Sequence, residues 1–329
     1  MTSALPFDDF RSLVQRLPEA NDFAGNRVRE RLRELGSPGE GLGKIGDLAE
    51  WLATWSSRPA QVNRPLVAIF AGTHGVMKQG VARERLEATA ATVEHLAAGG
   101  AAVSQICGAN DLGLKVFDLA LDMPTEDLST GAAFDERGCA ATMAFGMEAV
   151  AGGFDLVALS ATGVGGDFAT ATVLTALWGG APSTWISTED DKLASRQADV
   201  IDQALRFHGA GNLRDPFEIL RRVGGREVAA LVGAIIAARS ERIPVILDGY
   251  PALAAAALLQ AGNPAAVDHC QVASTMGTLA GRAILDRLGM QPILGLNVSQ
   301  AGVGAGLATL VVRTAAQVVS GLRAMPTPN

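Results

Sequence analysis

The chain has 329 residues, of which 48% are hydrophobic and 5% aromatic, and its formal net charge is −7 at pH 7. This length allows one large globular domain with a smaller lobe, because single cores usually stop growing near roughly 250 to 300 residues. The acidic balance and the scarcity of aromatic side chains exclude the cationic, base-stacking surface on which nucleic-acid binding depends.

The first stretch, MTSALPFDDFRSLVQRLPEA, has no basic segment followed by a long apolar run, so no signal peptide is expected. The most apolar stretch, YPALAAAALLQAGNPAAV, is interrupted by Asn263 and Pro264, so no membrane span is expected. Cys107, Cys139 and Cys270 lie far apart and show no metal-binding or redox spacing. We therefore expect a soluble cytoplasmic protein with buried free thiols, no metal and no membrane contact.

Residues 1–60 are predicted to be largely helical, because FDDFRSLVQRL, NRVRERLREL and IGDLAEWLATW repeat apolar residues with helical spacing. The segment GSPGEGLGK predicts a loop. From Pro65 onward, short apolar runs alternate with alanine-rich stretches. Strands are predicted at 66–72, 114–121, 155–163, 244–249 and 291–298, and helices at 84–99, 138–151, 167–178, 191–207, 225–240, 250–261 and 303–320.

Continuous apolar strands indicate burial on both faces, and the alternation of strands with helices indicates parallel pairing. The predicted fold class is α/β, with a doubly wound, mainly parallel sheet flanked by helices. Ligands of such sheets bind beyond the carboxyl ends of the strands. The segments at these ends are GTHGVMKQGVA, DMPTED, TGVGGD, DGYPA and NVSQAGVGAG.

Two of these segments, TGVGGD and SQAGVGAG, follow a strand and open a helix, but neither has GxGxxG or P-loop spacing. A helix start of this kind can hold an anion. Asp167 offers an alternative, because an aspartate at a helix start can satisfy the exposed N–H groups itself and repel a phosphate. We expect the second arrangement, in which Asp167 caps its own helix and no phosphate binds there.

Two other polar residues at strand ends have open roles. His74 in AGTHGV could be a ligand contact or a general base, or it could be a structural histidine in a glycine turn. Asp248 in ILDGYPA could grip a ligand hydroxyl or cap the following helix. The acidic segment STEDDK at 187–192 predicts a solvated helix start, where carboxylates complement the helix dipole.

Long segments of the chain resemble the nicotinate-nucleotide:dimethylbenzimidazole phosphoribosyltransferase family of cobalamin synthesis. They include RPLVAIFAGTHGV, AAGGAAVSQICGANDLGLKVFDLALD, CAATMAFGMEAVAGG, GGREVAALVGAIIAARSERIPVILDGYPALAAAALL and NPAAVDHC. The resemblance implies a large α/β domain at 61–302 and a small helical lobe built from 1–60 and 303–329. It also implies a homodimer with sites near the subunit contact.

The family transfers phosphoribose from nicotinate mononucleotide to 5,6-dimethylbenzimidazole, and a carboxylate takes the proton from the base. No metal or cofactor is implied. Where the family reads RLGEGTGAALA, this chain reads VSQAGVGAGLA, so the catalytic glutamate falls on Ala301, with Gln300 as its neighbour. Where the family reads GEMGIGNTT, this chain reads SATGVGGDF.

The resemblance therefore implies a site that keeps its frame and loses its contacting groups. The vestigial nucleotide and phosphate site comprises Ala161, Thr162, Gly163, Gly165, Gly166, Asp167, Arg196, Asp248 and Gly249. The vestigial base pocket comprises His74, Gly75, Val76, Met77, Ala82, Ala91 and Ser299.

Three hypotheses follow from these departures. The favoured one is a non-catalytic or strongly impaired binding or interaction protein, which either works beside an active paralogue or carries a related base or nucleoside. The second is an active phosphoribosyltransferase with an altered substrate, in which Asp167 or Asp248 supplies the carboxylate. The third is plain retention of the family reaction.

Overall fold

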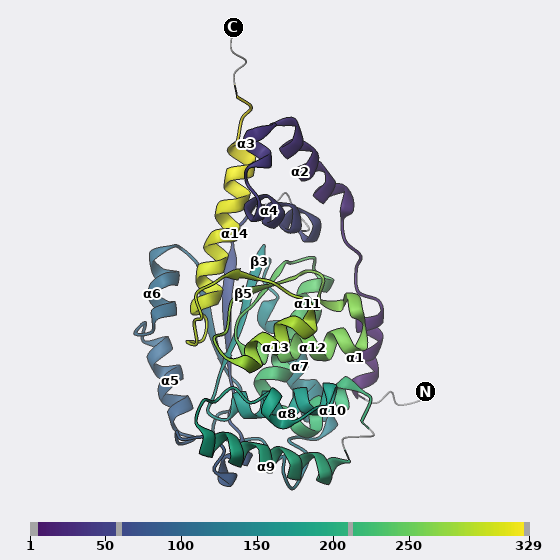
Figure 1. The fold of residues 1–329 in the computed structure, drawn as a ribbon, viewed down its shortest axis with the longest axis vertical. Helices are drawn as coiled ribbons and strands as arrows, with labels where there is room; N and C mark the ends of the chain where they lie inside the picture. The colour runs from purple at the N-terminus through teal and green to yellow at the C-terminus, as the bar shows by residue number, and fades with distance from the viewer. Residues whose placement is uncertain (1–5, 57–60, 210–212, 326–329) are drawn as a thin grey trace.

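Six parallel strands form the central sheet of the computed structural model, which describes residues 6–56, 61–209 and 213–325 (Figure 1). Their spatial order is β2-β1-β3-β4-β5-β6. The strands are β1 (Pro65–Ala71), β2 (Gly113–Asp118), β3 (Leu156–Thr162), β4 (Val245–Leu247), β5 (Cys270–Ser274) and β6 (Pro292–Leu294). The chain winds from β1 to the edge at β2 and returns to β3, so the winding direction reverses between β1 and β3. A ligand site is expected at that switch point.

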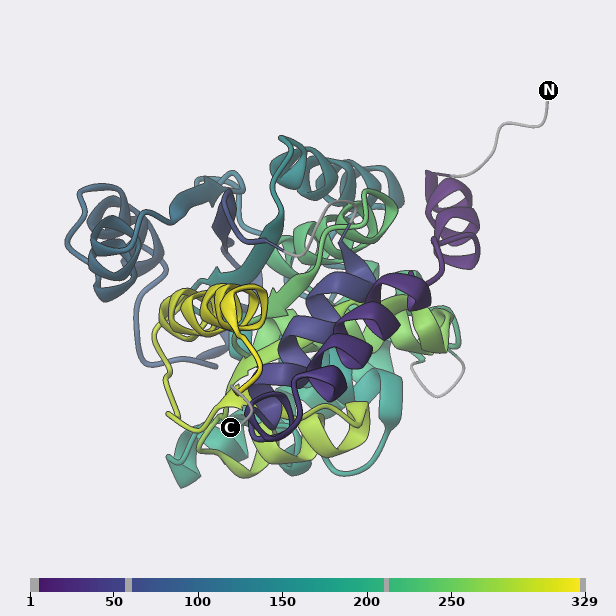
Figure 2. The ribbon, with the colours of Figure 1, turned by 90° about the horizontal axis from the view of Figure 1, so that it is seen from above.

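The helices are α1 (Pro6–Gln15), α2 (Asp22–Glu34), α3 (Ser37–Glu40), α4 (Lys44–Trp55), α5 (Ala88–Ala97), α6 (Ala102–Ala109), α7 (Glu136–Val150), α8 (Gly166–Trp178), α9 (Asp191–His208), α10 (Pro216–Val223), α11 (Arg226–Ser240), α12 (Tyr250–Gly262), α13 (Leu279–Leu288) and α14 (Val303–Gly321). Helices cover both faces of the sheet, so the predicted α/β class is confirmed. Figure 2 shows α5 and α6 standing out to one side of the remaining helices.

Several short elements differ from the sequence prediction. The segment GSPGEGLGK contains the single-turn helix α3, and α6, α10, β5 and α13 were not predicted. The strand predicted at 291–298 is limited to β6, because this edge strand pairs with β5 only through the Val272–Pro292 and Ser274–Leu294 positions. Strand β5, with the sequence CQVAS, is too short and too polar at its second residue to produce a clear apolar run.

Alternate residues of the central strands face two separate cores. Leu66, Ala68 and Phe70 of β1 face the core that also contains α7, α8, α11 and α12. Val67 and Ile69 face the other core, which contains α4, α6 and α14. This alternation follows from the two-residue period of a strand and explains why the whole of β1 is apolar.

Helices α7 and α11 cross at very short range. A Cβ atom added to Gly146 would lie 1.9 Å from the carbonyl oxygen of Ala230, and one added to Gly233 would lie 1.8 Å from that of Met143. Real Cβ atoms do not approach a carbonyl so closely, so only glycine fits at either position. The start of α11 lies at the carboxyl end of the sheet, where Gly72, which follows β1, packs against Glu227.

The helices from the two ends of the chain pack together at one end of the molecule (Figure 1). The Arg31 guanidinium on α2 donates hydrogen bonds to the carbonyl oxygens of Val319, Ser320 and Leu322 at the end of α14. Helix α1 packs instead against α7 and α12. The expected domain boundary at residue 60 lies outside the described residues.

Helix α14 is, within 6–56, 61–209 and 213–325, the one helix long and apolar enough to cross a membrane. It contacts the sheet and α4, and half of its most apolar window is buried inside the fold. Packing of α14 against the sheet and α4 therefore explains why this helix is apolar.

Candidate functional site

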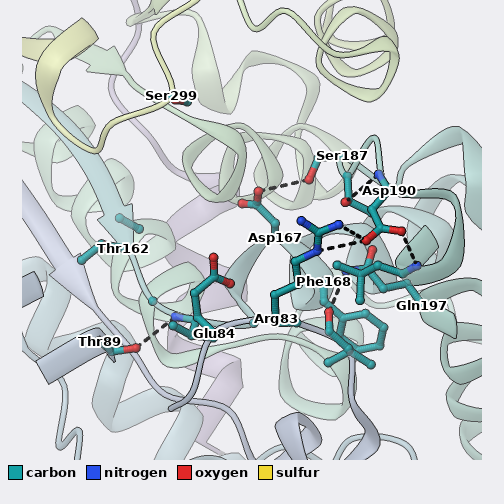
Figure 3. A pocket seen from close by; sticks show the side chains of 18 of the residues that line it. Arg83, Glu84, Thr89, Thr162, Asp167, Phe168, Ser187, Asp190, Gln197 and Ser299 are labelled. Carbon is teal, nitrogen blue, oxygen red and sulfur yellow. Dashed lines mark hydrogen bonds and ion pairs between the residues drawn. The ribbon is translucent and has the colours of Figure 1, made fainter. Parts of the chain in front are cut away.

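A pocket of about 790 Å³ opens at the carboxyl ends of β1 and β3, where the winding direction reverses (Figure 3). We call it the main chamber. It is formed by the loop after β1, the first half of α5, the glycine turn after β3, the start of α9 and the loop before α14. Its lining comprises 81–84, Thr89, Thr92, 161–165, Asp167, Phe168, 187–190, Leu193, Gln197, Ser299 and Ala301.

A second pocket of about 480 Å³ adjoins the first, and we call it the side chamber. The two chambers share Thr92, Thr162, Ser299 and Ala301. The remaining lining of the side chamber comprises His95, Leu96, 100–103, Gln300 and Val303. Ala301 therefore lies at the junction and presents a methyl group to both chambers.

The glycine turn between β3 and α8 forms one wall of the main chamber. Gly165 has a φ of +92°, a left-handed conformation that glycine adopts without strain. The backbone N–H of Val164 donates to the Thr89 hydroxyl at 3.0 Å, which ties the turn to α5. The N-cap residue of α8 is Gly165, which has no side chain with which to cap the first turn. The frame of an anion-binding helix start is thus present.

Asp167 does not cap α8, contrary to the sequence prediction. The N-cap position belongs to Gly165, Asp167 lies two residues later, and its carboxylate bonds to no backbone N–H group of the described residues. Its carboxylate instead accepts a hydrogen bond from the Ser187 hydroxyl at 3.1 Å (Figure 3). Although the residue is exposed to the chamber, the surrounding protein displaces water from its carboxyl group. This desolvation raises the pKa of Asp167, and the bond from Ser187 offsets it only partly.

Four carboxylates and one guanidinium line the main chamber. Arg83 forms an ion pair with Asp190, which holds the pKa of that carboxyl below its usual value. Asp190 also caps α9 by accepting from the N–H groups of Lys192 at 2.9 Å and Leu193 at 3.2 Å. The predicted helix start at STEDDK is confirmed, but the segment also forms a wall of the chamber. The remaining carboxylates belong to Glu84, Asp167 and Glu189.

His74 lies beneath the glycine turn, outside both chambers. Its Nε2 is 3.2 Å from Oε1 of Glu227, and both side chains are at most 1% exposed. Burial by itself raises the pKa of Glu227, but the charge of His74 and the contact with it outweigh burial and hold that pKa below its usual value. Of the two roles left open for His74, the structure supports the structural one.

Glycines make room for this buried pair. A Cβ atom at Gly225 would lie 2.4 Å from Glu227 Oε1 and 2.5 Å from the Cε1 atom of His74, and one at Gly72 would lie 2.3 Å from Glu227 Oε2. Sequence reasoning missed Glu227. The available signal was a single acid at the start of the apolar helix REVAALVGAIIAA, which has no other reason to be buried.

Asp248 contacts neither a chamber nor the helix that follows it. Its carboxylate accepts from the backbone N–H of Gly302 at 3.0 Å and also bonds to the N–H of Ala305 and to Ser160. It therefore caps α14, and both roles proposed from sequence for Asp248 are wrong. Burial raises its pKa to about 6 despite these three bonds. The carboxylate of Asp248 therefore neutralises the start of α14, the helix that follows the second glycine turn.

The other predicted site residues divide between the chambers and the fold. Ala82, Ala161, Thr162, Gly163, Gly165, Asp167, Ser299 and Ala301 line the main chamber, and Gln300 lines the side chamber. Gly75, Val76 and Gly166 are buried, Met77 packs against the core, and Gly249 precedes α12. Ala91 is exposed on α5. The Arg196 guanidinium donates to the carbonyl oxygen of Gln79 at 2.7 Å.

Several lining residues were not singled out by sequence. They are Val81, Arg83, Glu84, Thr89, Thr92, Val164, Leu193 and Gln197 in the main chamber, and His95, Leu96, 100–103 and Val303 in the side chamber. Within the described ranges, no group of three His, Cys, Asp or Glu side chains is placed to hold a metal ion. The arrangement can donate and accept hydrogen bonds through hydroxyls and carboxylates.

Comparisons with known proteins identify the family of this chain. The family model described as Phosphoribosyltransferase matches residues 17–327. The chain is 48% identical over 324 residues to the nicotinate-nucleotide–dimethylbenzimidazole phosphoribosyltransferase of Allorhizobium ampelinum, covering 97% of this chain and 95% of the relative. The enzyme of that name from Rhizobium johnstonii is 49% identical over 324 residues, covering 97% and 96%.

The crystal structure of the nicotinate-nucleotide–dimethylbenzimidazole phosphoribosyltransferase of Thermus thermophilus has the same fold. It matches this chain with a TM-score of 0.81 and 27% identity, covering 90% of this chain and 95% of that one. The resemblance noted from the sequence is confirmed by these matches. The chain belongs to the phosphoribosyltransferase family that includes the nicotinate-nucleotide–dimethylbenzimidazole phosphoribosyltransferases.

Proposed function

We propose that this protein is a family member that binds a ligand in its two chambers and transfers phosphoribose very slowly or not at all. The observation that carries the proposal is the chemical character of the main chamber. Its lining holds the carboxylates of Glu84, Asp167, Glu189 and Asp190 against the single guanidinium of Arg83, which is already paired with Asp190. A phosphate monoester carries close to two negative charges at neutral pH and would enter an acidic chamber.

The carboxylates of the main chamber act against the one feature that favours an anion there, which is the start of α8. An uncapped helix start stabilises a negative group by only about 0.3 to 1 kcal/mol at an exposed site. Asp167 lies in the first turn of α8, so its carboxylate already occupies that favourable field. A phosphate at the turn would have to approach this carboxylate, and like charges within a few ångströms repel.

The junction of the chambers also lacks a base. The family resemblance places the catalytic glutamate at Ala301, which lines both chambers and can accept no proton. Loss of a positioned general base typically lowers a rate by roughly 10²- to 10⁴-fold. We further propose that the protein is cytoplasmic, forms a homodimer and works beside an active relative.

A second candidate function is a transferase with an altered substrate that uses Asp167 as its base. The raised pKa of this exposed carboxyl group is the observation that favours it, because a base with a higher pKa accepts a proton more readily. Asp248 cannot serve in this way, since it is buried and its oxygens are bonded within the fold.

Incubation of the purified protein with nicotinate mononucleotide and 5,6-dimethylbenzimidazole tests the proposal, with the Allorhizobium ampelinum relative as the positive control. We expect no phosphoribosylated base at rates near those of ordinary enzymes, which are at least about 1 per second. Product at such a rate would contradict the proposal. Loss of that product in Asp167→Asn would then favour the second candidate.

A gain-of-function variant separates the missing base from the acidic chamber. If the absent carboxylate were the sole defect, Ala301→Glu would raise turnover by roughly 10²-fold or more, whereas Ala301→Gln, of equal size, would not. We expect Ala301→Glu alone to remain inactive. We expect turnover only when Asp167→Asn and Glu189→Gln are added to reduce the repulsion.

A further inference from the structure

The charged groups that remain free in the main chamber are all carboxylates. Asp190 is matched by Arg83, the one cationic residue in the lining. The carboxylates of Glu84, Asp167 and Glu189 form no ion pair with any described residue. They belong to three separate segments, which are the loop after β1, the first turn of α8 and the segment before α9. A ligand that compensates all of them must carry positive charge at more than one place.

A buried amide supplies an acceptor that is independent of these carboxylates. Gln197 on α9 lines the main chamber although it is only 7% exposed (Figure 3). Its Nε2 donates to the carbonyl oxygen of Val81 at 2.7 Å, and because a carbonyl can only accept, this bond fixes which end of the amide is nitrogen. Oε1 accepts no hydrogen bond from the residues that the structure describes. A nearly buried acceptor at a cavity wall needs a donor from whatever fills the cavity.

The nearest side-chain donors are already used within the chamber wall. The Ser187 hydroxyl donates to Asp167, and the Arg83 guanidinium donates to Asp190. Apolar side chains complete the wall between the oxygens, and they include Val81, Val164, Phe168 and Leu193. An ammonium group has three N–H donors and no acceptor, and the methylene chain attached to it can pack on apolar side chains. The chamber therefore fits an aliphatic amine with several ammonium groups.

We propose that the main chamber binds an aliphatic polyamine, whose ammonium groups are held by the carboxylates of Glu84, Asp167 and Glu189. One N–H of the amine donates to Oε1 of Gln197. The inference rests on the proposed function, in which the chambers bind a ligand, and it names the chemical class of the ligand in the main chamber. A trivalent amine matches the three unpaired carboxylates in charge, whereas a phosphate monoester would add to their repulsion.

Titration calorimetry with spermidine in about 150 mM NaCl tests the proposal. The matched probe is 1,8-octanediol, which has a chain of equal length and no charge. We expect one spermidine to bind per chain and the diol not to bind. Asp167→Asn and Glu189→Gln should each weaken spermidine binding at least about fivefold, because each removes a hydrogen bond between charged groups. Gln197→Leu, with its folding checked by circular dichroism, should weaken it by about threefold or more.

Asp191→Asn is the control for a smaller negative charge, because Asp191 is exposed on α9 and lies outside the lining of the chamber. It should bind spermidine like the wild type. Absence of spermidine binding by the wild type, equal binding of the diol, or equal losses in Asp191→Asn and Asp167→Asn would overturn the inference and leave the proposed function standing. Rapid phosphoribosyl transfer by the wild type would contradict the proposed function alone, because the amine titration contains neither substrate of that reaction.

Discussion

His74 Nε2 lies 3.2 Å from Glu227 Oε1, and the pair is sealed beneath the glycine turn that opens α8. The two residues are far apart in sequence, one after β1 and the other at the start of α11. A buried charge without its partner is costly, whereas a paired one adds little net stability. The pair therefore fixes the arrangement of the strand end and the two helices more than it adds to the free energy of unfolding.

We expect Glu227→Gln to lower the free energy of unfolding by roughly 3 to 5 kcal/mol, because it removes one partner of a buried pair. Urea denaturation followed by circular dichroism measures the change. Glu218→Gln is the matched control, since Glu218 forms partly exposed pairs with Arg221 and Arg222 and should change stability by about 1 kcal/mol or less. Equal effects of the two variants would contradict the structural role assigned to the buried pair.

The close crossing of α7 and α11 predicts that two glycine-to-alanine variants change stability in opposite directions. Gly233→Ala should destabilise the protein by more than about 2 kcal/mol, because its Cβ would collide with the Met143 carbonyl oxygen. Gly108→Ala in α6 meets nothing within 4 Å and should stabilise it by about 0.5 to 1 kcal/mol through helix propensity. Thermal unfolding of both variants tests this, and a neutral Gly233→Ala would show that the helices are farther apart.

Removal of the negative charge of Asp167 should strengthen the binding of anions in the main chamber. Asp167→Asn should tighten the binding of inorganic phosphate by about two- to fivefold, the effect of a single charge near a helix start. Ser187→Ala removes the hydroxyl that bonds to this carboxylate and retains the charge, so it should give no gain. Titration calorimetry at low ionic strength makes the comparison, and equal affinity in both variants would exclude Asp167 as the source of repulsion.

Asp248 predicts a decline in stability with rising pH. Its pKa is raised from 3.8 to about 6 in the folded state, so the native protein binds this proton more tightly than the unfolded chain does. This contribution to the free energy of unfolding is complete when the pH is below 3.8, the pKa of Asp248 in the unfolded chain. It is lost as the pH rises through the folded-state pKa of about 6, by about 3 kcal/mol in all.

Asp248→Asn cannot ionise and should lack this part of the pH dependence. Urea denaturation between pH 4 and pH 7 compares the two proteins, and the free energy of unfolding of the wild type relative to the variant should fall by about 2.4 kcal/mol over this range. Asp202→Asn, at an exposed position of α9, is the control for loss of a charge. Parallel pH curves for Asp248→Asn and the wild type would contradict the raised pKa.

The sequence by itself determined the class of fold and the two glycine turns. Apolar runs such as LVAIFA and the helical periodicity of the alanine-rich segments are local, so they predict β1 and the long helices without knowledge of the rest. The turn with Gly163 and Gly165 was placed correctly at a strand end for the same reason. Short elements such as β5 and α13 escaped, because neither is long enough to show a clear period.

Only the tertiary structure decided which polar groups meet. Asp167 precedes an apolar helix, as a capping residue would, yet the backbone places the N-cap at Gly165 and directs the carboxylate to Ser187. Asp248 caps α14, which begins more than fifty residues later, and Glu227 pairs with His74 across the sheet edge. Such contacts depend on how the strands are wound beside one another. A local pattern specifies each helix and strand, but not the distant side chain that its ends will meet.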